Sequence, residues 1–197
     1  METLLPLLVF VVVSTCTPGP NNFMVLASGA TFGLERTLPH IAGIALGFPV
    51  MIVAVGLGLS AVFEALPWLN HVLQYVAFAY LCWLAWKIAT AGRPQEGGGV
   101  AGRPFTALQA ALFQWVNPKA WSLVLGGTTL FISADGNRLG QILFFALLFG
   151  IVCIPNGLVW ALFGRVISRF LAHDGRRLWF NIGMAVLLVG SALPALF

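Results

Sequence analysis

Charged residues are scarce in this chain. Lys, Arg, Asp and Glu together account for 8% of its 197 residues, whereas 59% are hydrophobic, and a typical soluble domain carries about 25% charged residues. The mean hydropathy is +0.94. This composition excludes a soluble globular protein and gives no support to nucleic-acid binding. It predicts an integral protein of the lipid bilayer.

Cysteine is also rare. Cys16, Cys82 and Cys153 each stand alone in an apolar segment, unlike a redox pair or a metal site, so we expect them to serve in packing. The three histidines are expected near helix ends or in loops, without a metal-ligand partner at helical spacing. The motifs Gly-x-Ser-x-Gly and His-Glu-x-x-His do not occur. We therefore predict no metal site, no cofactor and no enzyme activity.

Acidic residues are missing from the apolar segments. All of them fall in predicted loops or at helix ends: Glu2, Glu35, Glu64, Glu96, Asp135 and Asp174. An exporter of inorganic ions is expected to place clustered acids or thiols in the membrane interior, so the sequence disfavours that class. Among the basic residues, Lys119 falls inside a predicted helix. An unpaired charge at mid-membrane costs at least about 2.5–3.5 kcal/mol, so its position requires a reason.

Apolar segments long enough to cross a bilayer, which takes about 20 residues, make up most of the chain. They lie at residues 4–31, 41–63, 69–91, 105–132, 139–163 and 178–197. The sequence therefore predicts an all-α integral membrane protein with six transmembrane helices. Residues 92–104 are rich in Gly and Pro and carry charge, which indicates a cytoplasmic linker. It would join two three-helix halves, 1–91 and 105–197, in one membrane domain.

Basic residues are distributed unevenly between the two sides of this arrangement. Most flank the odd-numbered loops: Arg36, Lys87, Arg93, Arg103, Arg165, Arg169, Arg176 and Arg177. Arg138 lies on the opposite side. Because Lys and Arg are retained on the cytoplasmic side, the odd-numbered loops are predicted to be cytoplasmic, with the N- and C-termini both outside.

Two prolines and a glycine interrupt the helix predicted for the first apolar segment. Pro18 and Pro20 lack the backbone N–H, and Gly19 between them loosens the chain. Carbonyl groups one turn earlier lose their partners, which a membrane protein tolerates only where the backbone is buried in protein or lines a cavity. The polar side chains available to satisfy them are Thr15, Thr17, Asn21 and Asn22.

The fourth segment is interrupted in the same way. Asn117 and Pro118 are typical of a helix cap and the first residue of a new half-helix, and the break falls at a similar distance from the start of each segment. Since each half crosses the membrane three times, the second half would be inverted relative to the first. The sequence thus predicts an inverted 3+3 repeat with broken helices 1 and 4, as in alternating-access transporters.

These motifs resemble those of the LysE/RhtB family of bacterial amino-acid exporters, and most of all the branch that exports cysteine and O-acetylserine. The matching stretches are Thr17-Pro-Gly-Pro-Asn21, Gly33, Ala42-Gly-Ile-Ala-Leu-Gly47, Tyr80-Leu-Cys-Trp-Leu-Ala-Trp-Lys-Ile-Ala89 and Gln114-Trp-Val-Asn-Pro-Lys119. The resemblance implies efflux of amino acids or their relatives across the bacterial inner membrane, energised by the proton motive force. Many relatives carry an acid directly after the second glycine of Gly-x-x-x-Gly. This chain has Phe48 there, which weakens the case for proton coupling through that position.

We expect the substrate to bind between the two breaks. The candidate substrate-binding residues are Thr17, Pro18, Gly19, Pro20, Asn21, Asn22, Gln114, Asn117, Pro118, Lys119 and Asn156. The carboxylate of an amino acid would lie at the half-helix N-termini near Asn21 and Asn117, with added charge from Lys119. The ammonium group would face freed carbonyls around Thr15 to Thr17, or the ring of Trp115 or Trp121.

Several alternatives stay open. Lys119 could instead extend to an interface, and Asn156 could bond only its neighbours. Gly43 and Gly47 form a Gly-x-x-x-Gly pair that suits either packing within the bundle or a homodimer. Coupling could use a proton released by Lys119, or transport could be driven by substrate alone.

The predicted function is a secondary transporter, an antiporter, that exports small neutral amino acids or derivatives of the cysteine, O-acetylserine, homoserine or threonine type. Lysine and arginine are disfavoured because no interior carboxylate would pair with their side chains. The alternatives are an exporter of another small solute or ion, or a non-transporting membrane subunit. The expected partners are the amino-acid substrate, the lipid bilayer and a second copy of the chain.

Overall fold

The computed structural model describes residues 4–59, 61, 65–90, 103–133, 137–171 and 174–193. Within these ranges the regular elements are all helical. They are α1 (Leu4–Cys16), α2 (Pro20–Phe32), α3 (Leu34–Ala54), the π-helical turn η1 (Val55–Leu59), α5 (Pro67–Ala89), α6 (Ala107–Phe113), the 3-10 turn η2 (Gln114–Val116), α7 (Pro118–Phe131), α8 (Arg138–Ser168) and α9 (Asp174–Gly190). The all-α prediction is confirmed for these residues. The predicted linker, residues 92–104, lies outside the described residues apart from Arg103 and Pro104.

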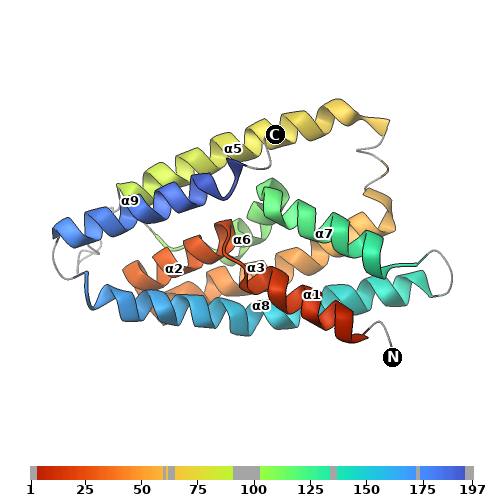
Figure 1. Cartoon of the computed structure of the whole chain (residues 1–197), viewed down its shortest axis with the longest axis horizontal. Coiled ribbons are helices and arrows are strands. Elements are labelled where there is room, and N and C mark those ends of the chain that lie inside the picture. Colours follow the sequence, from red (N-terminus) through yellow and green to blue (C-terminus); the bar gives the residue numbers. More distant parts are fainter. Residues whose placement is uncertain are drawn as a thin grey trace.

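The long helices run roughly along one axis, in two layers (Figure 1). One layer contains α3 and α8, with α1 and α2 beside them. The other is the pair α5 and α9, which lie side by side and pack on α2 and α6 through a cluster that includes Met24, Leu81, Phe113 and Leu188. The larger core cluster lies between α1, α3, α7 and α8 and includes Val11, Phe48, Val124 and Phe149.

Helices α3 and α8 are antiparallel. Three contacts mark their course: Gly157 with Ile41, Gly150 with Ala45, and Gly56 with Ile142. At the far end, Nη2 of Arg138 donates to the Gly56 carbonyl at 3.1 Å. Arg36 therefore lies toward one end of the helix pair and Arg138 toward the other, which is the arrangement that the predicted topology requires.

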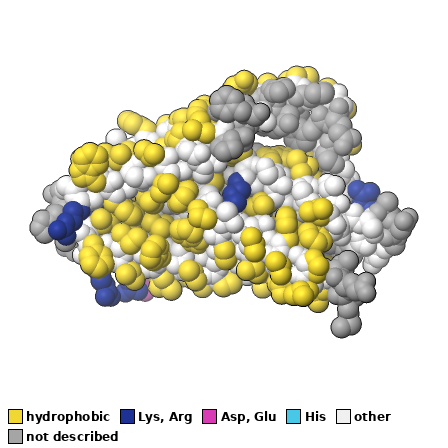
Figure 2. All heavy atoms as spheres, viewed as in Figure 1, with side chains coloured by type: hydrophobic (Ala, Val, Ile, Leu, Met, Phe, Trp, Pro, Cys, Tyr) yellow, Lys and Arg dark blue, Asp and Glu magenta, His cyan; other side chains and the backbone are white. Residues whose placement is uncertain are grey.

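The outer surface suits a lipid environment. Large hydrophobic side chains are exposed on the long helices, among them Leu46, Leu130 and Trp179. Figure 2 shows one face that is largely apolar, with basic side chains at both ends of the long axis and one basic group near its middle. A soluble protein would not expose so much apolar surface.

The number of membrane crossings is not decided by helix length and hydropathy. Among the described residues, two helical stretches, Leu34–Leu59 and Arg138–Ser168, are long and apolar enough to cross a membrane, and α1 with α2 forms a third if the bent pair is one span. The six crossings and the inverted repeat therefore stay predictions.

The second predicted segment begins earlier than expected, at Leu34 rather than near residue 41. Gly33, with φ +80°, turns the chain sharply between α2 and α3. The negative charge of Glu35 in the first turn of α3 interacts favourably with the positive end of the helix dipole and stabilises this start of the helix. As a result His40 is not near a helix end but deep in the protein, 1% exposed and stacked on Phe105 with ring centres 5.2 Å apart. The side chains of His71 and His173 lie outside the described residues.

The Gly-x-x-x-Gly pair packs within one chain. A Cβ atom on Gly43 would come within 2.2 Å of the Ala107 carbonyl oxygen, and one on Gly47 within 2.8 Å of the Ala111 backbone. Such distances leave room for glycine alone, so these residues bring α3 directly against α6. Of the two roles predicted for the pair, the structure favours packing within the bundle.

Candidate functional site

The first break has the form that its prolines predicted. Helix α1 ends at Cys16, α2 begins at Pro20, and the two axes differ in direction by 52°. Nδ2 of Asn22 donates to the carbonyl oxygens of Thr15 at 2.8 Å and Thr17 at 2.9 Å. The Asn22 side chain therefore satisfies backbone groups that the break sets free, as expected in a segment without access to bulk water.

The second break is also confirmed. After the 3-10 turn η2, Asn117 adopts an extended conformation and caps α7, its Oδ1 accepting from the backbone N–H of Lys119 at 3.2 Å. Pro118 occupies the first turn of the new helix, where a missing N–H costs nothing. Both sequence-predicted roles are thus observed.

An amide pair joins the two breaks. Asn21 donates through Nδ2 to Oε1 of Gln114 at 2.8 Å, and Gln114 returns a bond through Nε2 to Oδ1 of Asn21 at 3.2 Å. Gln114 is fully buried and also donates to the Ala110 carbonyl at 2.8 Å. Residues 93 positions apart in the chain are therefore held together by reciprocal hydrogen bonds.

Lys119 extends from α7 to the first break. Its Nζ donates to the carbonyl oxygen of Thr17, and to that of Pro18 at 3.3 Å. The side chain is therefore directed at the backbone of the first break. It occupies carbonyls of the kind that we expected to receive a substrate ammonium group.

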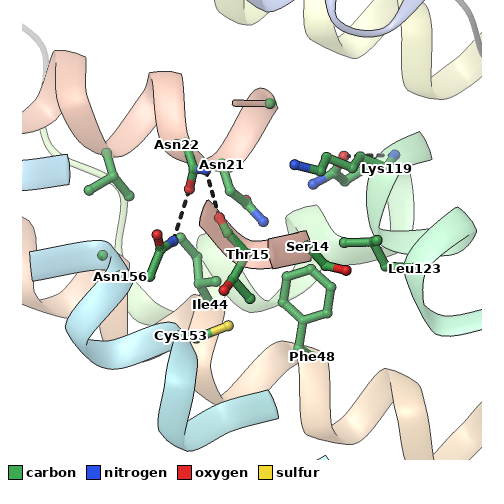
Figure 3. A pocket seen from close by; sticks show the side chains of 14 residues that line it. Ser14, Thr15, Asn21, Asn22, Ile44, Phe48, Lys119, Leu123, Cys153 and Asn156 are labelled. Carbon is green, nitrogen blue, oxygen red and sulfur yellow. Dashed lines mark hydrogen bonds between the residues drawn. The ribbon is translucent and has the colours of Figure 1, made fainter. Parts of the chain in front are cut away.

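Helix α8 contributes Asn156, which lies opposite Asn22 in Figure 3. Its Nδ2 donates to Oδ1 of Asn22 at 3.1 Å. Asn156 thus bonds a residue of the first break, and its amide extends the polar network across to the second half of the chain.

A small cavity lies where these elements meet. Its lining residues are Ser14, Thr15, Gly19, Asn21, Asn22, Val25, Ile44, Phe48, Asn117, Lys119, Leu123, Cys153, Asn156 and Gly157. The space open to the centres of water molecules is about 30 Å³, enough for a few waters at most. Admission of an amino acid therefore requires the surrounding helices to move apart.

Six of the predicted site residues line this cavity, namely Gly19, Asn21, Asn22, Asn117, Lys119 and Asn156. Thr17, Pro18, Pro20, Gln114 and Pro118 do not line it, and instead shape the two breaks or bond to them. Trp115 and Trp121 pack on each other, with ring centres 6.0 Å apart, and neither lines the cavity.

The sequence does not predict the apolar walls of the cavity. Ile44 and Phe48 lie one turn apart on α3, and Cys153 and Gly157 one turn apart on α8. Helical spacing could have grouped each pair, but nothing local indicates which face of α3 or α8 meets the breaks. Phe48 stacks on Phe149 at 4.6 Å and closes the cavity on that side.

The electrostatic character of the cavity follows from its lining. Gly19 and Asn117 are the N-caps of α2 and α7, so the positive ends of two helix dipoles face it. Lys119 adds a cation, and among the described residues no acidic side chain lines the cavity. The site therefore favours a ligand that carries a negative group.

Comparison with known proteins identifies the family. Residues 12–197 match the family described as LysE type translocator. The chain is 33% identical over 189 residues to the cysteine/O-acetylserine efflux protein of Escherichia coli O157:H7, an alignment that covers 93% of this chain and 92% of the relative. It is 32% identical over 186 residues to the protein of the same name from Salmonella paratyphi A, with the same coverage. No solved structure gives a significant match.

The family match includes both breaks and every residue that lines the cavity. The resemblance stated from the sequence motifs is therefore confirmed. The chain belongs to the LysE family of translocators, and it is a membrane transporter rather than an enzyme.

Proposed function

We propose that this protein is a secondary transporter that exports small neutral amino acids or their derivatives from the cytoplasm across the bacterial inner membrane. The substrates would be of the cysteine, O-acetylserine, homoserine or threonine type. The observation that carries the proposal is the convergence of both broken helices on one cavity that holds a single cation, uncharged amides and two helix N-termini. The name of the relatives, cysteine/O-acetylserine efflux protein, supports the same substrate class.

The proposed binding mode follows the charges of the site. The substrate carboxylate lies between the N-termini of α2 and α7, near Asn21 and Asn117, because helix N-termini attract anions. Lys119 supplies the countercharge. The substrate ammonium group faces the carbonyl oxygens of the first break, which α2 leaves without backbone partners.

Substrate size and charge follow from the walls. Ile44, Phe48, Leu123 and Cys153 present apolar surface to the cavity, which suits a short side chain without charge. A dibasic substrate would bring a second cation into a site without a carboxylate, where an unpaired charge is costly. We therefore expect lysine to be transported far more slowly than cysteine or O-acetylserine.

The predicted architecture completes the proposal. We infer six crossings in an inverted 3+3 repeat, with residues 1–91 and 105–197 as its halves and both termini outside. Support comes from the antiparallel pairing of α3 with α8 and from the meeting of the two breaks at one cavity, since an inverted repeat brings equivalent elements together in opposite directions.

Coupling to the proton motive force is part of the proposal. Family resemblance supports it, and Lys119 is the ionisable amine at the cavity. Phe48 replaces the acid that many relatives carry, so a proton would not be carried at that position.

The first experiment is uptake into inside-out membrane vesicles. A labelled panel of cysteine, O-acetylserine, serine, threonine, leucine and lysine is offered with and without a protonophore. We expect accumulation of small neutral members, collapsing with the protonophore. No accumulation of any member by protein shown to be inserted would contradict amino-acid export. It would favour another solute or a non-transporting subunit.

The chain offers a matched pair of variants for the same assay. Asn117 and Asn137 are both asparagine caps, accepting from the backbone N–H of Lys119 and Gly140 respectively, but only Asn117 lines the cavity. Each Asn→Ala change costs about 1 kcal/mol of helix stability. We expect Asn117→Ala to reduce transport at least tenfold and Asn137→Ala to leave it nearly unchanged, whereas equal effects would argue against a binding role for the second break.

A further inference from the structure

Lys119 makes an unusual contact for a residue near a helix N-terminus. A cation at this position lies close to the positive end of the dipole of α7. The Lys119 ammonium group donates to the carbonyls of Thr17 and Pro18 at the other break. These partners are 102 and 101 residues away in the chain. The contact therefore joins the two broken helices by a cation and two backbone oxygens.

The backbone at the first break is shaped for this contact. A Cβ atom on Gly19 would come within 2.6 Å of Cδ and 3.2 Å of Nζ of Lys119. Gly19 is fully extended, with φ −179°, a conformation open to any residue. An alanine at this position would therefore displace the lysine side chain from its present path without straining the backbone.

The carbonyls that Lys119 contacts have the chemistry of an ammonium site. The hydrogen bonds of α2 begin with the Gly19 carbonyl, which accepts from the N–H of Phe23 at 3.0 Å. Thr17 and Pro18 precede this first bond, so their oxygens point out of the helical pattern. Carbonyl oxygens freed in this way bind cations in broken membrane helices. A lysine ammonium and an amino-acid ammonium are chemically alike, and two such cations cannot occupy the same oxygens together.

We propose that Lys119 is a tethered substitute for the ammonium group of the substrate. The substrate ammonium displaces the Lys119 ammonium from the Thr17 and Pro18 carbonyls, and the freed Lys119 then pairs with the substrate carboxylate. When substrate leaves, Lys119 returns to the carbonyls and holds the two breaks together. The inference rests on the proposed function as an amino-acid exporter.

This exchange of cations gives Lys119 a role in the return of the empty transporter. With substrate bound, the substrate itself joins the two breaks. Without it, Lys119 supplies the charged link between the breaks, beside the uncharged amide pair of Asn21 and Gln114, and the empty transporter needs that charged link to return to the cytoplasmic side. The site also selects for a free ammonium group, so an N-acetylated amino acid, which cannot displace Lys119, is not a substrate.

The test compares two transport modes in proteoliposomes. Exchange of labelled for unlabelled substrate uses only the loaded protein, whereas net transport also needs the empty protein to return. We expect Lys119→Met to weaken exchange through loss of the carboxylate partner, and to lower the ratio of net transport to exchange about tenfold. Lys87→Met is the matched control, because Lys87 is the other lysine of the chain and its ammonium lies over the Trp83 ring, away from the cavity lining. It leaves both rates unchanged.

The outcomes separate this inference from the proposed function. If Lys119→Met lowers both modes in the same proportion, or neither, the tethered role is wrong although export stands. If the unmodified protein transports no amino acid in either mode, the proposed function fails and this inference fails with it. Should Lys119→Met not fold, Gly19→Ala decides instead, since it displaces the lysine side chain and is expected to lower the same ratio. An unchanged ratio in Gly19→Ala overturns the inference.

Discussion

At the scale of single residues, His40 is the least satisfied group of the described protein. It is 1% exposed, and within the described ranges neither Nδ1 nor Nε2 has a hydrogen-bond partner. Stacking on Phe105 is its principal compensation. An aromatic pair contributes about 0.5–1.5 kcal/mol, whereas each unsatisfied buried polar group costs about 1–3 kcal/mol, so the polar cost exceeds the stacking gain.

We predict that His40→Leu stabilises the protein. The change removes two unsatisfied nitrogens and retains similar volume, so the expected gain is about 1–2 kcal/mol, measured as thermal unfolding in detergent. His40→Asn keeps a polar group, loses the stacking and should lower the melting temperature. A lower melting temperature for His40→Leu would show that the imidazole has a polar partner that stabilises the fold.

Individual residues also show where sequence reasoning ended. Asn117 and Pro118 were recognised because a cap and a first-turn proline act within a few residues of themselves. Lys119 was placed correctly at the start of a half-helix, but its side chain bonds the opposite half, and no local signal specifies a partner so distant. The sequence predicts His40 near a helix end because the apolar segment starts only at residue 41, whereas α3 begins earlier and includes the polar residues Glu35 and Arg36.

At the scale of helices, close approach of α3 and α6 positions the second break. Gly43 lies against the Ala107 carbonyl and Gly47 against the Ala111 backbone, one to two turns before η2. Backbone atoms cannot move aside as a flexible side chain can, so any larger residue must push the helices apart.

We predict that Gly43→Ala destabilises the protein by about 1–3 kcal/mol, the usual cost of overpacking. Gly183 in α9 is the matched control, because a Cβ there meets nothing within 4 Å and Gly→Ala in a helix gains about 0.5–1 kcal/mol. Thermal unfolding of both variants, with size-exclusion chromatography, checks the prediction. A Gly43→Ala protein of normal stability but altered oligomeric state would instead assign the pair to a contact between copies.

Helix existence and the two breaks could be predicted because apolar length, proline and caps are local properties. The cavity walls could not. Phe48 and Cys153 lie in apolar stretches of long helices, and only the packing of α3 on α8 determines which side meets the cavity. For the same reason, the sequence predicts the helices of residues 69–91 and 178–197 but does not indicate that α5 and α9 pair in a separate layer.

At the scale of the whole molecule, the basic residues define an orientation. The antiparallel course of α3 and α8 places Arg36 toward one end and Arg138 toward the other. We predict that alkaline phosphatase fused after Phe197 is active in cells, because the proposed topology puts the C-terminus outside. The same enzyme fused within the linker 92–104 should be inactive, since basic loops stay in the cytoplasm. The reverse pattern of activities would overturn the proposed topology.

The connection between α2 and α3 has a mechanical consequence. Gly33 alone separates the two helices, and one residue offers only two freely rotating backbone angles. A swing of α2 at the first break must therefore either rotate about Gly33 or carry α3 with it. In the second case the wall with Ile44 and Phe48, which α3 supplies, would move together with the backbone of the first break. The cavity would then open by a rotation of α2 and α3 together about the first break.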